Sequence, residues 1–248
     1  RRPLNQHYLD AIDAFSLEEL FYFDTLNIDQ KRIDALRKLI SKKKILNSDF
    51  VKNDDDVAGA KERNKKEGFV PFVRSGSNYN YEKIPTRIVD KNDADIYSMS
   101  HVRNYLYLIN PGRYDTKEEF IEAIRKTDYD MVVIDVFFDG NNALTPDDIA
   151  LLKDKAHGGK RLVLSYMNIG AAENWRYYWQ RNWKIGAPKF LRKKYEGYDN
   201  EIYVDYSDKA WQKIIFGNDD SYVKRIIDAG FDGTYLDNTE AYLQLKNK

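Results

Sequence analysis

The sequence of 248 residues contains no cysteine, only three histidines and no excess of either charge. The absence of cysteine excludes disulfides, thiolate nucleophiles and cysteine-ligated metals. Forty lysines and arginines balance forty aspartates and glutamates, so no global field attracts nucleic acid or an anionic membrane. No apolar run approaches the roughly 20 residues that a membrane helix needs. We therefore expect neither a nucleic-acid partner nor a membrane span.

Motifs for cofactors and metals are missing as well. The chain has no GxGxxG or GxxxxGK[ST] phosphate loop, no HExxH zinc motif and no GxSxG nucleophile elbow. No EF-hand spacing occurs, and the acidic runs at 54–56 and 219–220 are typical of helix starts. The sequence therefore predicts no cofactor and no metal site.

Apolar strands alternate with amphipathic helices over most of the chain. Strands separated by helices indicate a parallel sheet. Because no phosphate loop follows any strand, a barrel is favoured over a nucleotide-binding sheet, and the length is close to the roughly 250 residues of one (β/α)8 barrel. We therefore predict an α/β fold with a single TIM-like barrel domain over 1–248. Strands are predicted at 44–50, 68–73, 105–109, 131–135, 161–167, 201–206 and up to Asp237, and helices at about 29–40, 54–66, 116–126, 145–157 and 209–229, the last interrupted near 217–218.

Residues 75–103 differ from the rest of the chain. Ser, Asn, Tyr, Asp and Pro dominate there, and no apolar period persists. Connections of this length are usually functional or disordered. We interpret the segment as a long surface connection, either a linker between domains or a lid over the barrel.

Acids or amides stand at or just after the ends of the predicted strands, where barrel enzymes place their catalytic groups. Taken singly, each acid is plainly explained as a solvated loop residue or a helix N-cap, but the regular placement of the set favours a functional role. A glycosidase needs two carboxylates that flank the scissile bond, and a metal site is the alternative use of such a cluster. The acids are Glu18, Asp49, Asp135, Glu173, Asp205 and Asp237, and the amides are Asn168 and Asn238.

Aromatic residues crowd directly after Glu173, and they include Trp175, Trp179 and Trp183. The tryptophans recur at helical spacing, which by itself is explained by packing in the core. Their position after a strand end favours the alternative, in which they stack on a sugar at the barrel mouth.

Three strand motifs carry a family resemblance. Val132–Asp135, then Leu164–Gly170 with Glu173–Arg176, then Gly230–Asn238 together resemble glycoside hydrolase family 114, collinearly over about 104–242. That family includes endo-α-1,4-polygalactosaminidases and a bacterial branch of often exported proteins. The resemblance implies a barrel glycosidase that acts on an α-linked, possibly amino-sugar, polysaccharide.

The resemblance also implies site residues. The catalytic pair falls on Asp237 and Glu18, and Asp135 and Glu173 line the cleft. The other residues that we expect to bind substrate are Asp49, Asn168, Trp175 and Asn238. The bacterial branch usually carries an acid where Ala171 stands, so this position departs from the family.

The order of the motifs implies a circularly rearranged barrel. Segments 15–22 and 44–49 resemble late strands of the family but come first here. Residues 8–73 then supply late barrel strands and 104–248 the early ones. A helix and a strand of the family have no counterpart between the equivalents of Asp237 and Glu18. This β/α unit is either missing from the chain, supplied by another copy or disordered, and because a barrel without it would expose two strand edges, we expect the gap to be filled.

Three functions follow from these patterns. The first is a glycosidase located outside the cell or in the periplasm. The chain starts at Arg1-Arg2-Pro3, which is compatible with a leader that has been removed. The second is a catalytically weak, carbohydrate-binding barrel, which Ala171 and the missing unit suggest. The third is an assembly protein that docks through 75–103.

Overall fold

A computed structural model describes residues 5–245, so Arg1–Pro3, from which a removed leader is inferred, lie outside the described residues. The chain divides into two compact units. Unit 1 runs up to Val132 and includes Leu152–Leu162, and unit 2 comprises Val133–Leu151 and the chain from Val163 onward. The segment 75–103 lies within unit 1.

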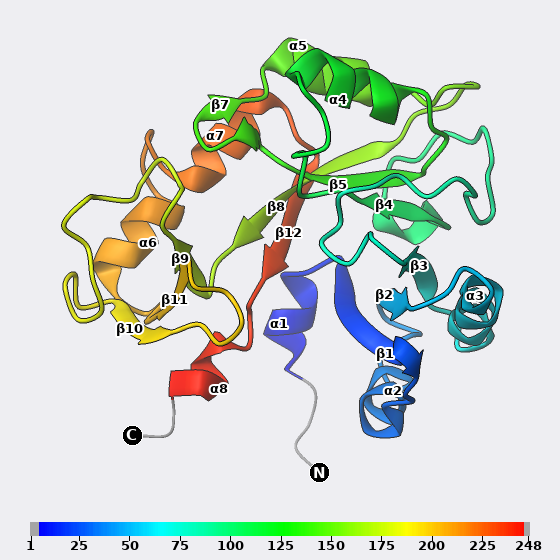
Figure 1. Cartoon of the computed structure of the whole chain (residues 1–248), viewed down its shortest axis with the longest axis horizontal. Coiled ribbons are helices and arrows are strands. Elements are labelled where there is room, and N and C mark those ends of the chain that lie inside the picture. The colour runs from blue at the N-terminus through cyan, green and yellow to red at the C-terminus, as the bar shows by residue number, and fades with distance from the viewer. Residues whose placement is uncertain (1–4, 246–248) are drawn as a thin grey trace. The chain divides into compact units, whose positions relative to one another are not determined.

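Unit 1 is built on a parallel sheet of order β1-β2-β3, whose strands are connected by helices (Figure 1). Asp29 caps α2 by accepting a hydrogen bond from the Arg32 backbone N–H at 2.9 Å, as its position at a helix start requires. The elements of unit 1 are α1 (Gln6–Asp10), β1 (Ala14–Leu26), α2 (Gln30–Leu36), β2 (Lys44–Val51), α3 (Asp56–Lys66), β3 (Val70–Ser75), η1 (Met99–His101), β4 (Tyr105–Tyr107) and α4 (Lys117–Arg125).

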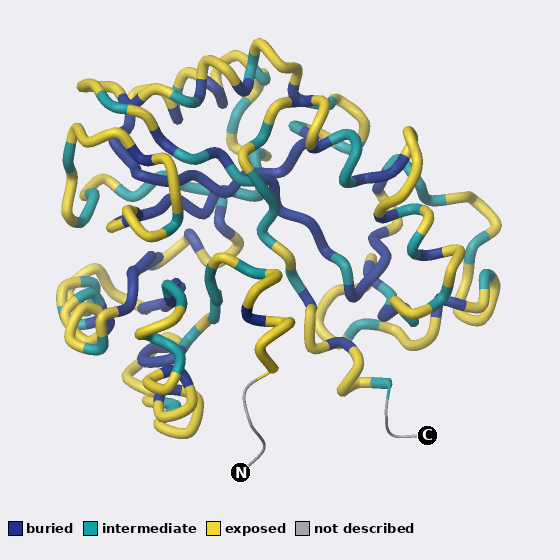
Figure 2. The backbone as a smooth tube through the Cα atoms, turned by 180° about the vertical axis from the view of Figure 1, so that it is seen from behind, coloured by how far each residue is buried: buried dark blue, intermediate teal, exposed yellow. Residues whose placement is uncertain are grey.

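The core of unit 1 forms where the sheet meets its helices. Alternate or successive apolar residues of β1, β2 and β3 are buried, and the apolar face of α2 closes over them. Figure 2 shows the strands of the chain mostly dark blue and the outer faces of the helices and loops yellow. The buried cluster comprises Leu20, Phe21, Tyr22, Ile33, Leu36, Ile45, Val51, Ala60, Phe69 and Val73.

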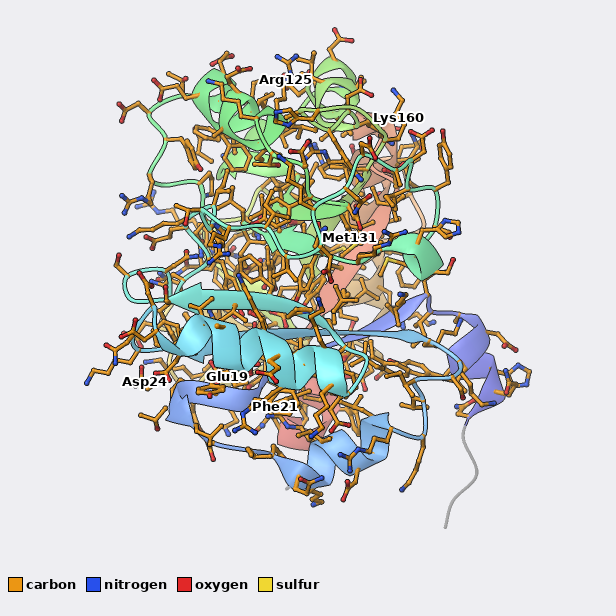
Figure 3. The ribbon with its side chains drawn as sticks, turned by 90° about the vertical axis from the view of Figure 1, so that its right-hand side faces the viewer. Glu19, Phe21, Asp24, Arg125, Met131 and Lys160 are labelled. Carbon is orange, nitrogen blue, oxygen red and sulfur yellow. The ribbon has the colours of Figure 1, made fainter. Side chains whose placement is uncertain are left out.

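β1 is interrupted by an irregularity in its pairing with β2. Glu18 lies opposite Ser48 and Phe23 lies opposite Phe50, so the register shifts between Glu18 and Phe23. Glu19 begins this bulge with a left-handed backbone (φ 60°), which is uncommon for a residue other than glycine. Figure 3 labels Glu19, Phe21 and Asp24 along this part of β1.

The connection 75–103 is tied down by a buried lysine. The side chains of Lys155 and Asp130 are fully buried, and their Nζ and Oδ1 atoms lie 2.7 Å apart. Lys155 also donates to the Ala94 carbonyl at 2.8 Å and the Asn92 side-chain oxygen at 3.1 Å, while Asp130 Oδ2 accepts from the Arg103 backbone N–H at 2.8 Å. The connection is therefore packed against the rest of unit 1 at a charged but fully hydrogen-bonded site.

Unit 2 contains three central strands in the order β12-β8-β5. The first residues of β5 and β8 are counted in unit 1, and the rest of each strand belongs to unit 2. β12 and β8 are parallel, with Asp237 opposite Asn168. The remaining elements are β5 (Met131–Asp135), β6 (Phe137–Asp139), β7 (Asn142–Ala143), α5 (Pro146–Leu152), β8 (Leu162–Asn168), β9 (Ala171–Glu173), β10 (Leu191–Lys194), β11 (Glu201–Val204), α6 (Lys209–Ile215), α7 (Tyr222–Ala229), β12 (Gly233–Asp237) and α8 (Ala241–Leu245).

The predicted break of the 209–229 helix and its end at Gly230 are confirmed. Ser221 caps α7 through its side chain, and Gly230 ends it with a left-handed backbone (φ 87°). The helix predicted at 145–157 ends earlier, at Leu152. It stops there because Asp154 and Lys160 form an antiparallel bridge and Lys155 turns into the core.

The prediction of a parallel strand at 201–206 is wrong. β11 lies between β10 and β9 and pairs antiparallel with both. The α/β class with parallel sheets is confirmed, but the strands of residues 5–245 form separate sheets and no closed barrel. The barrel and its circular rearrangement therefore stay predictions.

Candidate active site

Polar side chains of unit 2 gather around the ends of β5, β8 and β12 and on the small antiparallel sheet. The parallel register of β8 and β12 places Asn168 and Asp237 opposite each other at the end of the pair. We call the set the Asp237 cluster. It comprises Asp135, Tyr166, Asn168, Glu173, Arg176, Glu201, Asp237 and Asn238.

Arg176 joins two carboxylates of the Asp237 cluster. Its Nη1 lies 2.6 Å from Asp135 Oδ2, and its Nε lies 2.6 Å from Glu173 Oε2. All three side chains are buried. Because charge-assisted hydrogen bonds are short and directional, this guanidinium fixes both carboxylates in place. Burial works against the charge of Arg176, but the two carboxylates outweigh it and raise the pKa of Arg176 well above its usual value.

Asp237 is the partly exposed carboxylate of the cluster. The buried hydroxyl of Tyr166 donates to its Oδ2 at 2.7 Å, and the Asn238 backbone N–H donates to its Oδ1 at 2.8 Å. Burial, and then the negative charge of Asp237, raise the pKa of Tyr166 well above its usual value. Tyr166 therefore stays protonated and acts as a permanent hydrogen-bond donor to Asp237.

Two asparagines continue the hydrogen bonds away from Asp237. The Asn238 side-chain amide donates to Asn168 Oδ1 at 3.1 Å, and the Asn168 amide donates to Glu201 Oε2 at 3.1 Å. Tyr195 donates its hydroxyl hydrogen to Asn238 Oδ1 at 3.1 Å. Asn238 has a left-handed backbone (φ 56°), a conformation that asparagine tolerates better than most residues.

Two glutamates of the cluster have raised pKa values. Burial, and then the carboxylates of Glu173 and Asp237, raise the pKa of Glu201 to about 7. Burial raises the pKa of Glu173 to about 6, because Arg176 offsets only part of the effect and is shared with Asp135. Groups with such values can exchange protons near neutral pH, which general acid–base chemistry requires.

Unit 1 holds a second arrangement around Glu18, which we call the Glu18 cluster: Glu18, Glu19, Ser48, Arg74 and Tyr81. Glu18 is exposed and accepts a hydrogen bond from the hydroxyl of Tyr81. Tyr81 Oη also lies 3.1 Å from Ser48 Oγ, and the Arg74 guanidinium lies 4.2 Å from the centre of the Tyr81 ring. Arg74 reaches Glu19 Oε1 at 3.2 Å.

Asp49 is fully buried between β1 and α3. Its carboxylate accepts hydrogen bonds from the backbone N–H groups of Phe21 at 3.0 Å and Tyr22 at 3.2 Å. The amides of Asn47 and Asn64 donate to it at 2.9 Å and 2.6 Å. The hydrogen bonds of Asp49 hold β1 against β2. The role of Asp49 in binding substrate stays a prediction.

The aromatic segment after Glu173 is not helical. Residues 174–198 form turns, bridges and β10. Trp183 packs on Trp179 with ring centres 5.4 Å apart and on buried Phe190 at 5.2 Å. Trp175 instead remains 42% exposed, with the Arg176 guanidinium 5.9 Å from its ring centre. Core packing therefore accounts for Trp183, whereas Trp175 is exposed and its stacking on a sugar stays a prediction.

Asp205 does not join the Asp237 cluster through any described hydrogen bond. It accepts from the backbone N–H and hydroxyl of Ser207 at 3.1 Å and 2.5 Å, as expected of a turn acid. Among residues 5–245, no three His, Cys, Asp or Glu side chains are grouped as metal ligands, and no helix is long and apolar enough to cross a membrane.

Four residues of the two clusters are not predicted as site residues from the sequence: Tyr166, Arg176, Glu201 and Tyr81. Tyr166 and Arg176 stand inside the motifs that carry the family resemblance, so those motifs held the signal. Glu201 is the first residue of an antiparallel strand. The rule that functional acids follow the ends of parallel strands therefore does not predict it.

Comparison with protein families identifies the family to which the region containing the Asp237 cluster belongs. The model of glycoside-hydrolase family GH114 matches residues 115–248, more than half of the chain. The chain belongs to glycoside hydrolase family 114. All eight residues of the Asp237 cluster lie within the part that matches family 114, whereas Glu18 precedes it.

Relatives of this family 114 chain are uncharacterised proteins from three organisms. A protein of Deinococcus radiodurans is 36% identical over 128 residues, which cover 52% of this chain and 39% of the relative. A protein of Thermotoga maritima is 31% identical over 169 residues (58% of this chain and 50% of the relative), and one of Methanocaldococcus jannaschii is 31% identical over 131 residues (52% and 36%). The matches thus span half or less of each relative's length.

Proposed function

We propose that this chain hydrolyses glycosidic bonds in a polysaccharide and that Asp237 is one of its two catalytic carboxylates. The supporting observation is the environment of Asp237. It is a partly exposed acid at the end of a parallel strand, held by Tyr166 and by the Asn238 backbone, within the region that matches family 114. An acid held in one orientation but open to a ligand fits the demands of a catalytic carboxylate.

The second carboxylate of the proposed pair is Glu18. This assignment comes from the family resemblance, and the exposure of Glu18 and its hydrogen bond from Tyr81 support it. One carboxyl group would protonate the leaving oxygen, and the other would act as base or nucleophile. Water completes the hydrolysis, so the proposal includes no cofactor.

The proposed substrate is an α-linked polysaccharide that carries amino groups. The Asp237 cluster contains four carboxylates and one guanidinium, so it favours a cationic ligand over an anionic one. Asp135, Glu173, Asn168 and Asn238 would line the cleft for this substrate, and Trp175 would stack on a sugar ring. We also propose that the protein works outside the cell or in the periplasm.

The test is hydrolysis of an α-1,4-linked galactosamine polymer in its free-amine and N-acetylated forms. We expect release of reducing ends by the wild type and a loss of about 10²–10⁴-fold in kcat for Asp237→Asn and Glu18→Gln. Asp219→Asn changes an exposed acid of unit 2 outside the cluster and is the matched control. Equal turnover by Asp237→Asn and the wild type would remove the assignment. Binding of the polymer without product would favour the carbohydrate-binding alternative.

A further inference from the structure

Three hydrogen bonds connect Glu201 with Asp237. They run through the side chain of Asn168, the side chain of Asn238 and the backbone N–H of Asn238. Glu201 Oε2 accepts from Asn168 at 3.1 Å, Asn168 Oδ1 accepts from Asn238 at 3.1 Å, and the Asn238 backbone N–H donates to Asp237 at 2.8 Å. An amide has a donor end and an acceptor end, and its neighbours decide which way each end points. The carboxylate of Glu201 accepts only, so it turns the NH₂ of Asn168 toward itself and the oxygen toward Asn238.

The Asn168 oxygen also accepts the Ala171 backbone N–H at 2.9 Å, which fixes the same orientation from the other side. Close packing adds a further constraint on Asn238. A Cβ atom built on Gly170 would lie 2.1 Å from the Asn238 carbonyl oxygen, so the turn after β8 touches the backbone of Asn238. The backbone of Asn238 therefore has no room to move toward the turn that follows β8.

The pairing of β9 with β11 explains how an acid reaches this place from position 201. Glu201 lies opposite Glu173, and Tyr203 lies opposite Ala171, in an antiparallel ladder. Residues opposite each other, and residues two apart in a strand, share a face of the sheet. Position 171 therefore shares its face with Glu173 and Glu201. The side chain of Glu201 is therefore directed to the same face of this small sheet as that of Glu173, its partner across the ladder.

We propose that Glu201 is a positioning residue for Asp237, acting through Asn168 and Asn238. This inference rests on the proposed function, because Asp237 has its catalytic role there. The raised pKa of Glu201 adds a charge that changes near neutral pH. Ionised Glu201 holds Asn168 through a charge-assisted hydrogen bond, and protonated Glu201 holds it more weakly.

Several titratable or charged groups surround Glu201 and must be considered in any pH experiment. Glu173 and Asp237 raise the pKa of Glu201, and Asn168 and Arg176 lower it. Lys194, in the neighbouring strand β10, pairs with Asp199 at 2.6 Å. The other nearby groups are Tyr195 after β10, Tyr203 on β11, and Glu240 and Tyr242 at α8.

The kinetic test compares Glu201→Ala and Glu201→Gln with the wild type. We expect Glu201→Ala to lower kcat roughly tenfold with little change in KM, the order expected for one lost hydrogen bond to a charged group. Glu201→Gln keeps an acceptor for Asn168, so it should recover most of kcat while the pH profile loses its limb near pH 7. Glu196→Gln, an exposed acid of the same unit, is the control. A pH profile of Glu201→Gln that superimposes on the wild type overturns the inference even if Glu201→Ala does not fold.

A second measurement does not depend on activity. The carboxyl ¹³C signal of Glu201 is titrated by NMR in the wild type and in Asp237→Asn, and the side-chain amide signals of Asn168 and Asn238 are followed in parallel. We expect the Glu201 midpoint to fall in Asp237→Asn and both amides to shift with the titration of Glu201. If the wild type hydrolyses no polymer, the proposed function fails while this titration still decides the inference. The inference is overturned if the Glu201 midpoint is unchanged in Asp237→Asn, or if the amide signals of Asn168 and Asn238 do not shift as Glu201 titrates.

Discussion

The Glu18 and Asp237 clusters use the same local device in different electrostatic surroundings. In each, a carboxylate accepts a hydrogen bond from a buried tyrosine, Tyr81 or Tyr166. The next residue in the chain has a left-handed backbone, at Glu19 (φ 60°) and Asn238 (φ 56°). Backbone conformations of this kind cost energy and are found preferentially at functional sites. The similarity therefore supports a functional role for both carboxylates.

The difference lies in the charges around each carboxylate. In unit 1, Arg74 Nη2 lies 3.2 Å from Glu19 Oε1, and the Arg74 guanidinium lies 4.2 Å from the Tyr81 ring centre. In unit 2, Arg176 is shared by Asp135 and Glu173, and Glu201 adds a further carboxylate. An acid crowded by other acids holds its proton more readily. The comparison teaches that the same hydrogen-bonding geometry around a carboxylate occurs here in two different charge environments, a precondition for two carboxylates with different roles.

The largest expected effect is the loss of the shared arginine. Arg176→Met leaves Asp135 and Glu173 buried without their partner, which costs about 3–5 kcal/mol of unfolding free energy. Arg74→Met is the matched change in unit 1, and its cost should be less than half as large because Glu19 is partly exposed. Urea unfolding at pH 7.5 measures both. Equal losses of unfolding free energy in the two variants would mean that Arg176 and Arg74 stabilise their units to the same extent.

A second change acts on the tight contact behind Asn238. Gly170→Ala forces a Cβ to within 2.1 Å of the Asn238 carbonyl oxygen, so the backbone must move. We expect a destabilisation of about 1–3 kcal/mol and a fall in kcat from the displaced Asp237. Gly112→Ala is the control, because a Cβ there meets nothing within 4 Å. Thermal unfolding and activity that match the Gly112→Ala control would show that this contact is not rigid.

A third pair of changes removes the tyrosine hydroxyls. Tyr166→Phe and Tyr81→Phe each remove one donor to a carboxylate, at a cost of about 1–2 kcal/mol in stabilising the charged form. We expect kcat to fall roughly tenfold in each, with the pH profile moving on opposite limbs if the two carboxylates have opposite roles. Movement of the same limb in both variants would contradict a division into acid and base.

The smallest expected effect is on stability as a function of pH. The folded pKa values of Glu173 (about 6) and Glu201 (about 7) lie above the ordinary value of 4.5. Their contribution to stability is therefore complete below about pH 4.5 and is lost as the pH rises through 6 to 7. We expect the Tm of the wild type to fall over this window and the fall to shrink in Glu201→Gln.

Asp128 of unit 1 has the opposite behaviour. Its burial tends to raise its pKa, but hydrogen bonds from Lys91 and His157 lower the pKa to about 2. Its contribution is present above the ordinary value of 3.8 and is lost only as the pH falls through about 2. A Tm profile of Asp128→Asn that runs parallel to the wild type between pH 4.5 and 7 therefore serves as the control.

The parallel strands could be predicted because each is a short apolar run between polar turns. β5, β8 and β12 lie where the sequence indicates them. The strand at 201–206 was assigned the wrong direction because periodicity is the same for parallel and antiparallel strands. The direction depends on the strands with which β11 pairs, β10 and β9, and these are brought together only in the folded chain.

The candidate site was predictable for acids at parallel strand ends and not for their partners. Asp135 and Asp237 follow that rule, and Asn168 is paired with Asp237 as the parallel register requires. Tyr166 and Tyr81 stand in a chain with 19 tyrosines, so their identity alone carries no signal. Asp49 follows the rule as well, yet its side chain accepts hydrogen bonds from the backbone of β1. Strand alternation and packing determine this orientation, and neither can be read from the position of Asp49 at a strand end.

The buried lysine of unit 1 constrains the order in which the chain can mature. Asp130 and the carbonyl of Ala94 have Lys155 as a partner, and the Leu162 backbone N–H donates to the Asp130 carbonyl at 3.0 Å. During synthesis from the N-terminus, residues up to 132 leave the ribosome before these partners exist. Unit 1 therefore cannot complete its interior until the chain has been synthesised through residue 162, which includes the first segment of unit 2, Val133–Leu151.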